Sequence, residues 1–205
     1  MNNKGIIIVF EGIDQSGKGT QAKLFVESLR SRGFSAEYLH FHDTSTPIGK
    51  ELQLFFEGDR EFSPIVRQLL FTANRYERND YISESVKNND FIIIDRYIPS
   101  GLAYGIANGI EIDWMLNLES HLNQPDIVVL LDISSNTSKK RKAEENRDVY
   151  EKDLKFLEKV RKIYLKLANT FDWIIIDGTA NTDEVQNMVM EKVKEKLKNK
   201  GLYQI

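Results

Sequence analysis

The stretch that decides the fold is Gly12-Ile13-Asp14-Gln15-Ser16-Gly17-Lys18-Gly19-Thr20, which closely follows the apolar run 6–10. Two glycines bracket four residues and Lys18 comes next, which is the spacing of a phosphate-binding loop, or P-loop. The run before the loop predicts a buried strand, and helical periodicity follows at 21–29. Backbone N–H groups of such a loop and the N-terminus of the helix together attract an anion. The sequence therefore predicts a phosphate site at residues 12–20.

Size and composition indicate one ordinary globular domain. The chain has 205 residues, of which 41% are hydrophobic and 29% charged, and its net charge of −3 provides no basic field for nucleic acid or a membrane surface. It has no cysteine, which excludes disulfides, thiolate catalysis and zinc–thiolate sites. No apolar run reaches the roughly 18 residues that a membrane helix needs. We expect a single domain over 1–205, a cytoplasmic location, and no nucleic-acid or membrane partner.

Five short apolar runs alternate with helical stretches. Continuous hydrophobicity, seen in four of the five, is typical of parallel strands that are covered on both faces. The predicted strands are 6–10, 36–41, 91–95, 127–132 and 173–177. The predicted helices are about 17–32, 47–57, 64–88, 113–122, 153–169 and 183–199. This alternation predicts an α/β fold, a doubly wound five-stranded parallel sheet flanked by helices, of the P-loop NTPase type.

A basic segment follows the fourth predicted strand. Its cationic residues are Lys139, Lys140, Arg141, Lys142 and Arg147. A charge run by itself is often only a solvated helix surface. This one follows a strand on the edge of the sheet where ligands bind, so we interpret about 136–150 as a lid that closes over phosphates.

Two further segments carry candidate site residues. The strand 91–95 ends in a carboxylate, Asp95, as in a Walker-B motif that holds Mg²⁺, and Arg96 follows with a guanidinium suited to phosphates. In the helix predicted after residue 64, Phe71, Asn74 and Arg75 are spaced i, i+3 and i+4 and share a face. That face suits the stacking of a base and a hydrogen bond to its edge. The same spacing is expected of an amphipathic helix that buries Phe71, and both interpretations stay open.

Taken together, these residues resemble the thymidylate kinase family. The resemblance covers nearly the whole chain and rests on several motifs in the expected order. They are residues 10–14 with 16–18, 70–77, 95–97 with 100–104, 125–126, and 147 with 150–151. The resemblance implies transfer of the γ-phosphoryl group of ATP to dTMP, with Mg²⁺ as cofactor, by a homodimer.

Roles on the donor side also follow from the resemblance. Lys18 would contact the β and γ phosphates, Arg96 would bridge donor and acceptor phosphates, and Asp95 would lie near Mg²⁺. Metal contact would run through Thr20 or water, because Gly19 stands where many P-loops carry Ser or Thr. The implied ATP-binding residues are Gly12, Ile13, Asp14, Gln15, Ser16, Gly17, Lys18, Gly19, Thr20 and Arg141.

On the acceptor side, Asp14 would accept from the 3′-hydroxyl, Phe71 would stack on thymine, and Arg75 would bind the edge of the base. Tyr104 would line the deoxyribose pocket and Tyr150 would crowd out a 2′-hydroxyl. Asn74 and Arg147 complete the implied substrate-binding residues. The implied catalytic residues are Lys18, Arg96 and Asp14.

The segment 41–46 departs from the family pattern. It lacks the arginine that helps to bind the acceptor phosphate, and Thr44 stands there instead, with Lys50 as a possible substitute. Gln15 likewise replaces the P-loop arginine of one subgroup, for which Arg141 or Arg147 could substitute. The missing arginine keeps open a kinase of a deoxynucleoside or another pyrimidine monophosphate, because a neutral nucleoside would not need it. A P-loop ATPase switch and a slow homologue retained for assembly are two further alternatives.

Overall fold

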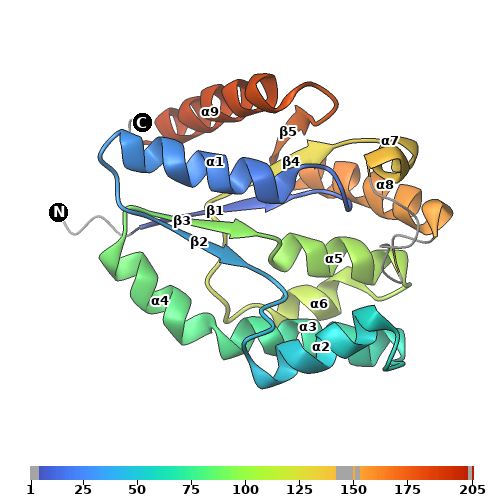
Figure 1. Cartoon of the computed structure of the whole chain (residues 1–205). Helices are drawn as coiled ribbons and strands as arrows, with labels where there is room; N and C mark the ends of the chain where they lie inside the picture. Colours follow the sequence, from blue (N-terminus) through green and yellow to red (C-terminus); the bar gives the residue numbers. More distant parts are fainter. Residues whose placement is uncertain (1–4, 142–149, 151–152, 203–204) are drawn as a thin grey trace.

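The computed structural model describes residues 5–141, 150, 153–202 and 205. Five strands form one parallel sheet in the order β2-β3-β1-β4-β5, which confirms the predicted fold class (Figure 1). The strands are β1 Ile6–Glu11, β2 Ala36–His40, β3 Phe91–Asp95, β4 Ile127–Asp132 and β5 Ile174–Asp177. The predicted strand bounds are correct to within one residue.

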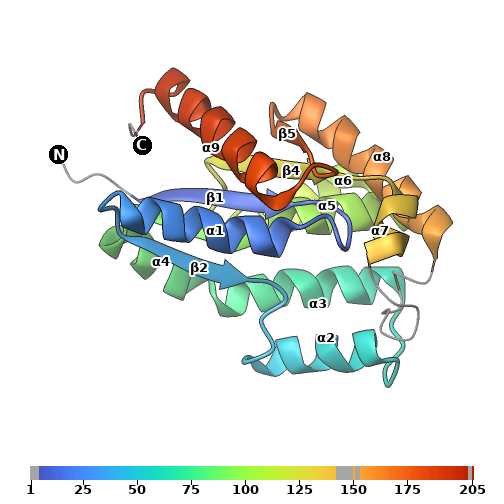
Figure 2. The ribbon, with the colours of Figure 1, turned by 45° about the horizontal axis from the view of Figure 1, so that its top comes forward.

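Both faces of the sheet are covered, which explains the continuous apolar runs. Ile7 and Val9 of β1 point into a core shared with α4, α5 and α8, whereas Ile6 and Ile8 point into a core shared with α1 and α9. Figure 1 shows α1 and α9 on one side of the sheet and α4 and α5 on the other. Figure 2 shows α2 and α3 packed side by side away from the sheet. Residues of both helices line a cavity. None of the described helices is long and apolar enough to cross a membrane.

The helices differ from the prediction in four places, the first of which is that the helix expected over 113–122 ends at Leu118. The nine described helices are α1 Lys18–Ser31, α2 Pro47–Glu57, α3 Pro64–Glu77, α4 Asn79–Asn88, α5 Ile98–Ala107, α6 Ile112–Leu118, α7 Ser135–Arg141, α8 Leu154–Thr170 and α9 Thr182–Asn199. The single helix expected over 64–88 is interrupted at Arg78, whose Nε donates to Asp43 Oδ2 at 2.5 Å and ties the break to the loop before α2. Helix α5 was not predicted, because Pro99, Gly101 and Gly105 are poor helix formers. Helix α7 lies within the charged segment that we interpreted only as a lid.

The sheet places the candidate groups at one edge. Phe10 of β1 is paired with Asp95 of β3, so the P-loop that follows β1 lies beside Asp95 and Arg96. Parallel strands all end at the same edge of the sheet, so the pairing of β1 with β3 is enough to bring the P-loop and the Asp95–Arg96 pair together.

Candidate active site

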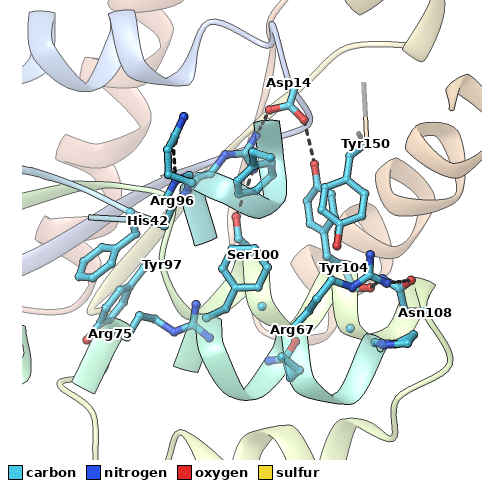
Figure 3. A pocket seen from close by; sticks show the side chains of 18 of the residues that line it. Asp14, His42, Arg67, Arg75, Arg96, Tyr97, Ser100, Tyr104, Asn108 and Tyr150 are labelled. Atoms are coloured by element: carbon cyan, nitrogen blue, oxygen red, sulfur yellow. Dashed lines mark hydrogen bonds and ion pairs between the residues drawn. The ribbon is translucent and has the colours of Figure 1, made fainter. Parts of the chain in front are cut away.

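A cavity of about 570 Å³ lies between the P-loop, α2, α3 and α5. Its wall includes Asp14 from the P-loop, Phe71 and Arg75 from α3, and Tyr104 from α5 (Figure 3). The described residues thus bring the predicted phosphate, sugar and base positions to one continuous space. A volume of several hundred cubic ångströms is in the range of small-molecule sites.

The P-loop is stabilised by backbone geometry and by a buried cation. Gly12 has φ 144°, and a Cβ there would lie 2.5 Å from the carbonyl oxygen of Leu131, so only glycine fits. The Lys18 ammonium contacts the carbonyl oxygen of Ile13 at 3.4 Å and Asp14 Oδ1 at 3.9 Å. Burial lowers the pKa of Lys18 and the neighbouring Arg96 charge lowers it further. Burial deprives the Lys18 ammonium of water, and the negative charge of a bound polyphosphate would compensate for this loss.

Asp14, Arg96 and Tyr104 form a charged cluster at the cavity edge nearest the P-loop. Arg96 donates to Asp14 Oδ1 and Tyr104 donates to Asp14 Oδ2 at 3.1 Å. Burial acts to raise the pKa of the Asp14 carboxyl, but the Arg96 and Lys18 charges outweigh it, so the pKa lies below its ordinary value. Asp14 therefore stays a carboxylate, able to accept a hydrogen bond.

Glu11 is a buried carboxylate beside the site that was not among the predicted site residues. The carboxylate at the end of β1 is buried and accepts four hydrogen bonds, from the Tyr97 and Ser100 backbone N–H groups and from the Ser100 and Tyr164 hydroxyls. It caps the first turn of α5, directly after Arg96, and Arg96 Nη1 donates to Ser100 Oγ at 3.3 Å. Burial raises the pKa of Glu11 although these donors and the Arg96 charge lower it. The sequence signals were an acidic residue ending a buried apolar run and its place in the motif 10–14.

Asp95 has the features expected of a metal-binding carboxylate. Its Oδ1 is buried and has no hydrogen-bond partner in the described part of the chain. A Cβ at position 19 would lie 2.7 Å from Asp95 Oδ2, so Gly19 lets the carboxylate lie directly against the P-loop. Thr20 is exposed. Within the described residues no cluster of three His, Asp or Glu side chains could hold an ion by itself. The site therefore suits a cation that a nucleotide brings and shares, as Mg²⁺ does.

The three predicted residues of α3 separate into two groups. Phe71 and Arg75 line the cavity, and Arg75 is paired with the buried Glu119 and donates to Thr72 Oγ1 at 3.2 Å. Asn74 is turned toward the loop before α2, where its side-chain amide accepts from Asp43 N at 2.9 Å and donates to Thr46 Oγ1 at 2.7 Å. Phe71 thus lies in the cavity wall rather than in either hydrophobic core.

Tyr150 is an aromatic part of the cavity wall and packs on Tyr104, whose hydroxyl donates to Asp14 of the P-loop. The buried Tyr150 lies 5.1 Å from Tyr104 and 5.9 Å from Phe55, measured between ring centroids. Arg147, the other residue expected in this region, lies outside the described residues. So does most of the segment 136–150 that we predicted to be a lid.

Arg141, at the end of α7, reaches the P-loop. Its guanidinium donates to the carbonyl oxygens of Gln15 at 3.0 Å and Gly178 at 2.8 Å. Arg141 therefore supplies a positive charge on the donor side of the P-loop. One subgroup of the family has a P-loop arginine at the position of Gln15, and Arg141 could take its place. By contrast, neither Thr44 nor Lys50 is among the cavity-lining residues.

His42, which belongs to the segment 41–46 that lacks the family's arginine, does line the cavity. Its ring stacks on Phe56 with centroids 4.8 Å apart, and Nε2 lies 3.1 Å from Gln53 Oε1. Burial lowers the pKa of His42 below its ordinary value. At neutral pH this side chain is therefore uncharged and does not replace the arginine electrostatically.

Comparison with known proteins agrees with this geometry. The family model described as thymidylate kinase matches residues 10–189. A thymidylate kinase from Dictyostelium discoideum is 34% identical over 190 residues, which cover 92% of this chain and 85% of the relative. One from Schizosaccharomyces pombe is 33% identical over 196 residues, which cover 93% of this chain and 92% of the relative. The solved structure of the Candida albicans thymidylate kinase superposes with a TM-score of 0.82 at 31% identity, covering 94% of this chain and 92% of that one. The chain belongs to the thymidylate kinase family.

Proposed function

We propose that this protein transfers the γ-phosphoryl group of ATP to dTMP and releases dTDP and ADP. The observation that carries the proposal is a single cavity that joins the P-loop cluster of Asp14 and Arg96 to the aromatic and cationic wall of Phe71 and Arg75. A nucleoside monophosphate needs both ends, a charged one for its phosphate and an apolar one for its base. Membership of the thymidylate kinase family supports dTMP as the acceptor.

The transfer step depends on cations that converge where the two nucleotides meet. Lys18 would follow the β and γ phosphates, and Arg96 would lie between the donor and acceptor phosphates, where its charge would stabilise the transition state. Asp14 is already oriented by Arg96 and Tyr104, and its remaining acceptor capacity suits the 3′-hydroxyl of the acceptor sugar. Catalysis by these residues is mainly positioning and neutralisation of charge.

On the donor side, the P-loop backbone would bind the ATP phosphates and Arg141 would lie against adenine. Asp95, directly or through water, and Thr20 would hold Mg²⁺, because the unpartnered Asp95 Oδ1 beside Gly19 fits such an ion. When bound, Mg²⁺ would neutralise phosphate charge in the transfer.

On the acceptor side, Phe71 would stack on thymine, Arg75 would donate to its edge, and Tyr104 and Tyr150 would enclose the deoxyribose. Asn74 would act indirectly, by holding the loop that leads into α2. Arg147 and the lid over about 136–150 remain predictions from the sequence, as do the cytoplasmic location and the single domain. The Candida albicans relative is described as having broad substrate specificity, so acceptors other than dTMP belong in the test.

A homodimer is also part of the proposal. One face of α3 exposes Ile65, Leu69 and Tyr76, with 46%, 42% and 37% of each residue accessible. Tyr76 Oη donates to the Leu118 carbonyl oxygen at the end of α6, where Leu116 is also exposed. Light scattering should give twice the monomer mass, and Leu69→Glu should give the monomer. A monomeric wild type would contradict this part of the proposal.

The function is tested by measuring ADP release with ATP and Mg²⁺ and a panel of acceptors: dTMP, dUMP, UMP, CMP, AMP and thymidine. We expect a strong preference for dTMP, and a loss of turnover by orders of magnitude in a folded Lys18→Met variant. A preference for thymidine or for a nucleotide other than dTMP would show that the proposed acceptor is wrong. ADP release without any acceptor would indicate an ATPase. Nucleotide binding with negligible turnover would indicate the slow homologue.

A further inference from the structure

Helix α3 carries a second arginine into the cavity that no motif pointed to. Arg67, Phe71 and Arg75 are spaced i, i+4 and i+8 and all line the cavity. In the view of Figure 3, Arg67 lies toward Tyr150 and Asn108, and Arg75 lies toward Tyr97 and His42. The two guanidinium groups therefore occupy different parts of the cavity, with the Phe71 position between them along the helix.

Arg67 is held in place by neutral groups from three other parts of the chain. Its guanidinium carbon lies 5.2 Å from the centroid of the Phe55 ring and 5.6 Å from that of Tyr150. Its Nη2 donates to Asn108 Oδ1 at 3.2 Å. Stacking on aromatic faces and a single hydrogen bond fix the plane of the guanidinium but engage few of its five N–H donors.

Both arginines have hydrogen-bonding capacity left over. The Nε atoms of Arg67 and Arg75 are buried and have no hydrogen-bond partner among the described residues. A buried donor without a partner is costly, and it is expected where a ligand supplies the acceptor. Arg67 and Arg75 both line the cavity, so a ligand with two separated acceptor atoms could accept from N–H groups of each that the described residues leave unengaged.

The spacing on α3 suits a pyrimidine-2,4-dione. Eight residues of α-helix rise about 12 Å, with Phe71 halfway. A base stacked on Phe71 has its C2 and C4 carbonyl oxygens on either side of N3, where they point in different directions in the plane of the ring. Two guanidinium groups that each donate to one of these oxygens would lie somewhat closer together than this rise, which the flexible arginine stems allow.

We propose that Arg67 is a second base-reading residue, which donates to the C2 carbonyl oxygen of the acceptor base while Arg75 donates to the C4 carbonyl oxygen. The inference rests on the proposed function and deepens it, because it assigns the substrate class of the same site. Two arginines, which can only donate, select a base with carbonyl acceptors on both sides of N3. Cytosine presents an amino donor at C4, and adenine presents no carbonyl at either edge, so both leave a guanidinium unpaired.

The test replaces one carbonyl oxygen at a time in the substrate. Sulfur accepts hydrogen bonds more weakly than oxygen, so 2-thio-dTMP probes the contact of Arg67 and 4-thio-dTMP probes that of Arg75. Steady-state kcat and KM are measured for dTMP and both analogues in the wild type and in Arg67→Met, which keeps an unbranched apolar stem between Phe55 and Tyr150. Arg60→Met is the matched control, since Arg60 is exposed, pairs with Glu51 and lies outside the cavity.

We expect Arg67→Met to raise the KM for dTMP by about ten- to hundredfold, as for loss of a hydrogen bond to a charged donor. The wild type should have a higher KM for 2-thio-dTMP than for dTMP, and this difference should vanish in Arg67→Met while the 4-thio difference persists. Arg67→Lys, which keeps the charge without the planar fork, should recover only part of the affinity.

An unchanged ratio of 2-thio-dTMP to dTMP in both Arg67 variants would overturn the proposal. So would an equal rise of KM for all three substrates together with a lowered melting temperature, because that result describes a structural arginine. Failure of the proposed function is a separate result, in which the wild type does not phosphorylate dTMP at all.

Discussion

The two ends of the cavity are built differently. At the phosphate end, the charged side chains bind one another: Arg96 is paired with Asp14, Lys18 lies near the same carboxylate, and Glu11 accepts four hydrogen bonds. At the base end, Arg75 is paired with Glu119, but Arg75 and Arg67 each keep a buried Nε without a partner in the described part of the chain. The phosphate end is thus arranged before a substrate arrives, whereas the base end leaves donors for the ligand. Changes at the first should lower kcat, and changes at the second should raise the acceptor KM.

The largest effect is expected at the phosphate end, from Arg96→Ala. Its guanidinium would lie between the transferred and accepting phosphates, and an arginine in that position is worth about 10³–10⁵ in kcat. Steady-state kinetics should show this loss, with the fold intact by circular dichroism. Turnover close to that of the wild type would show that Arg96 does not act on the transferring group.

Phe71→Ala sharpens the comparison from the base end. Stacking of a base on an aromatic side chain contributes about 1–3 kcal/mol, so the KM for dTMP should rise by roughly 10- to 100-fold while kcat changes little. Titration of the free protein with dTMP should show the same loss of affinity. An unchanged KM for dTMP would show that Phe71 only packs against its neighbours and does not stack on the base.

Glu11→Gln tests whether the phosphate end depends on its buried carboxylate. Gln keeps one acceptor oxygen for the Tyr97 and Ser100 N–H groups but puts an NH₂ group where Oε2 accepts from two hydroxyls. We expect kcat to fall about tenfold through displaced Arg96, as for loss of one to two hydrogen bonds, with a nearly constant KM for dTMP.

Tyr164→Phe is the control for this variant, because it removes one donor and keeps the carboxylate. It should lower kcat less than Glu11→Gln does. An effect of Glu11→Gln that fell on KM alone, or that Tyr164→Phe matched, would contradict the positioning of Arg96 by Glu11.

The sequence predicted the phosphate end better than the base end, for physical reasons. A P-loop and a strand ending in Asp95 are local patterns, and parallel strands bring their ends together in any doubly wound sheet. Helix α5 could not be predicted, because the Glu11 carboxylate that caps it comes from β1, 86 residues away from Tyr97. Asn74 shares a helical face with Phe71 in the sequence, yet its amide is turned toward the loop 43–46, which is distant in the sequence. Arg67 carried no signal, because its role depends on aromatic rings from α2 and from position 150.

The smallest effect is expected from His42→Gln, measured as stability against pH. Burial keeps the folded-state pKa of His42 below its ordinary value of 6.5, so the unfolded chain binds more protons and the free energy of unfolding decreases as pH falls through that range. The variant lacks this contribution, and its denaturation midpoint should decrease less between pH 8 and pH 5. An equal or steeper decrease would show that His42 is not held neutral beside Arg96.

The central claim is that the γ-phosphoryl group of ATP goes to a nucleotide bound in this cavity. Phosphorus NMR of the protein with ATP, Mg²⁺ and dTMP follows that group directly. The account predicts that the β-phosphorus signal of dTDP grows in step with that of ADP, without inorganic phosphate. Inorganic phosphate with no dTDP would contradict it and would show that water, not dTMP, is the acceptor.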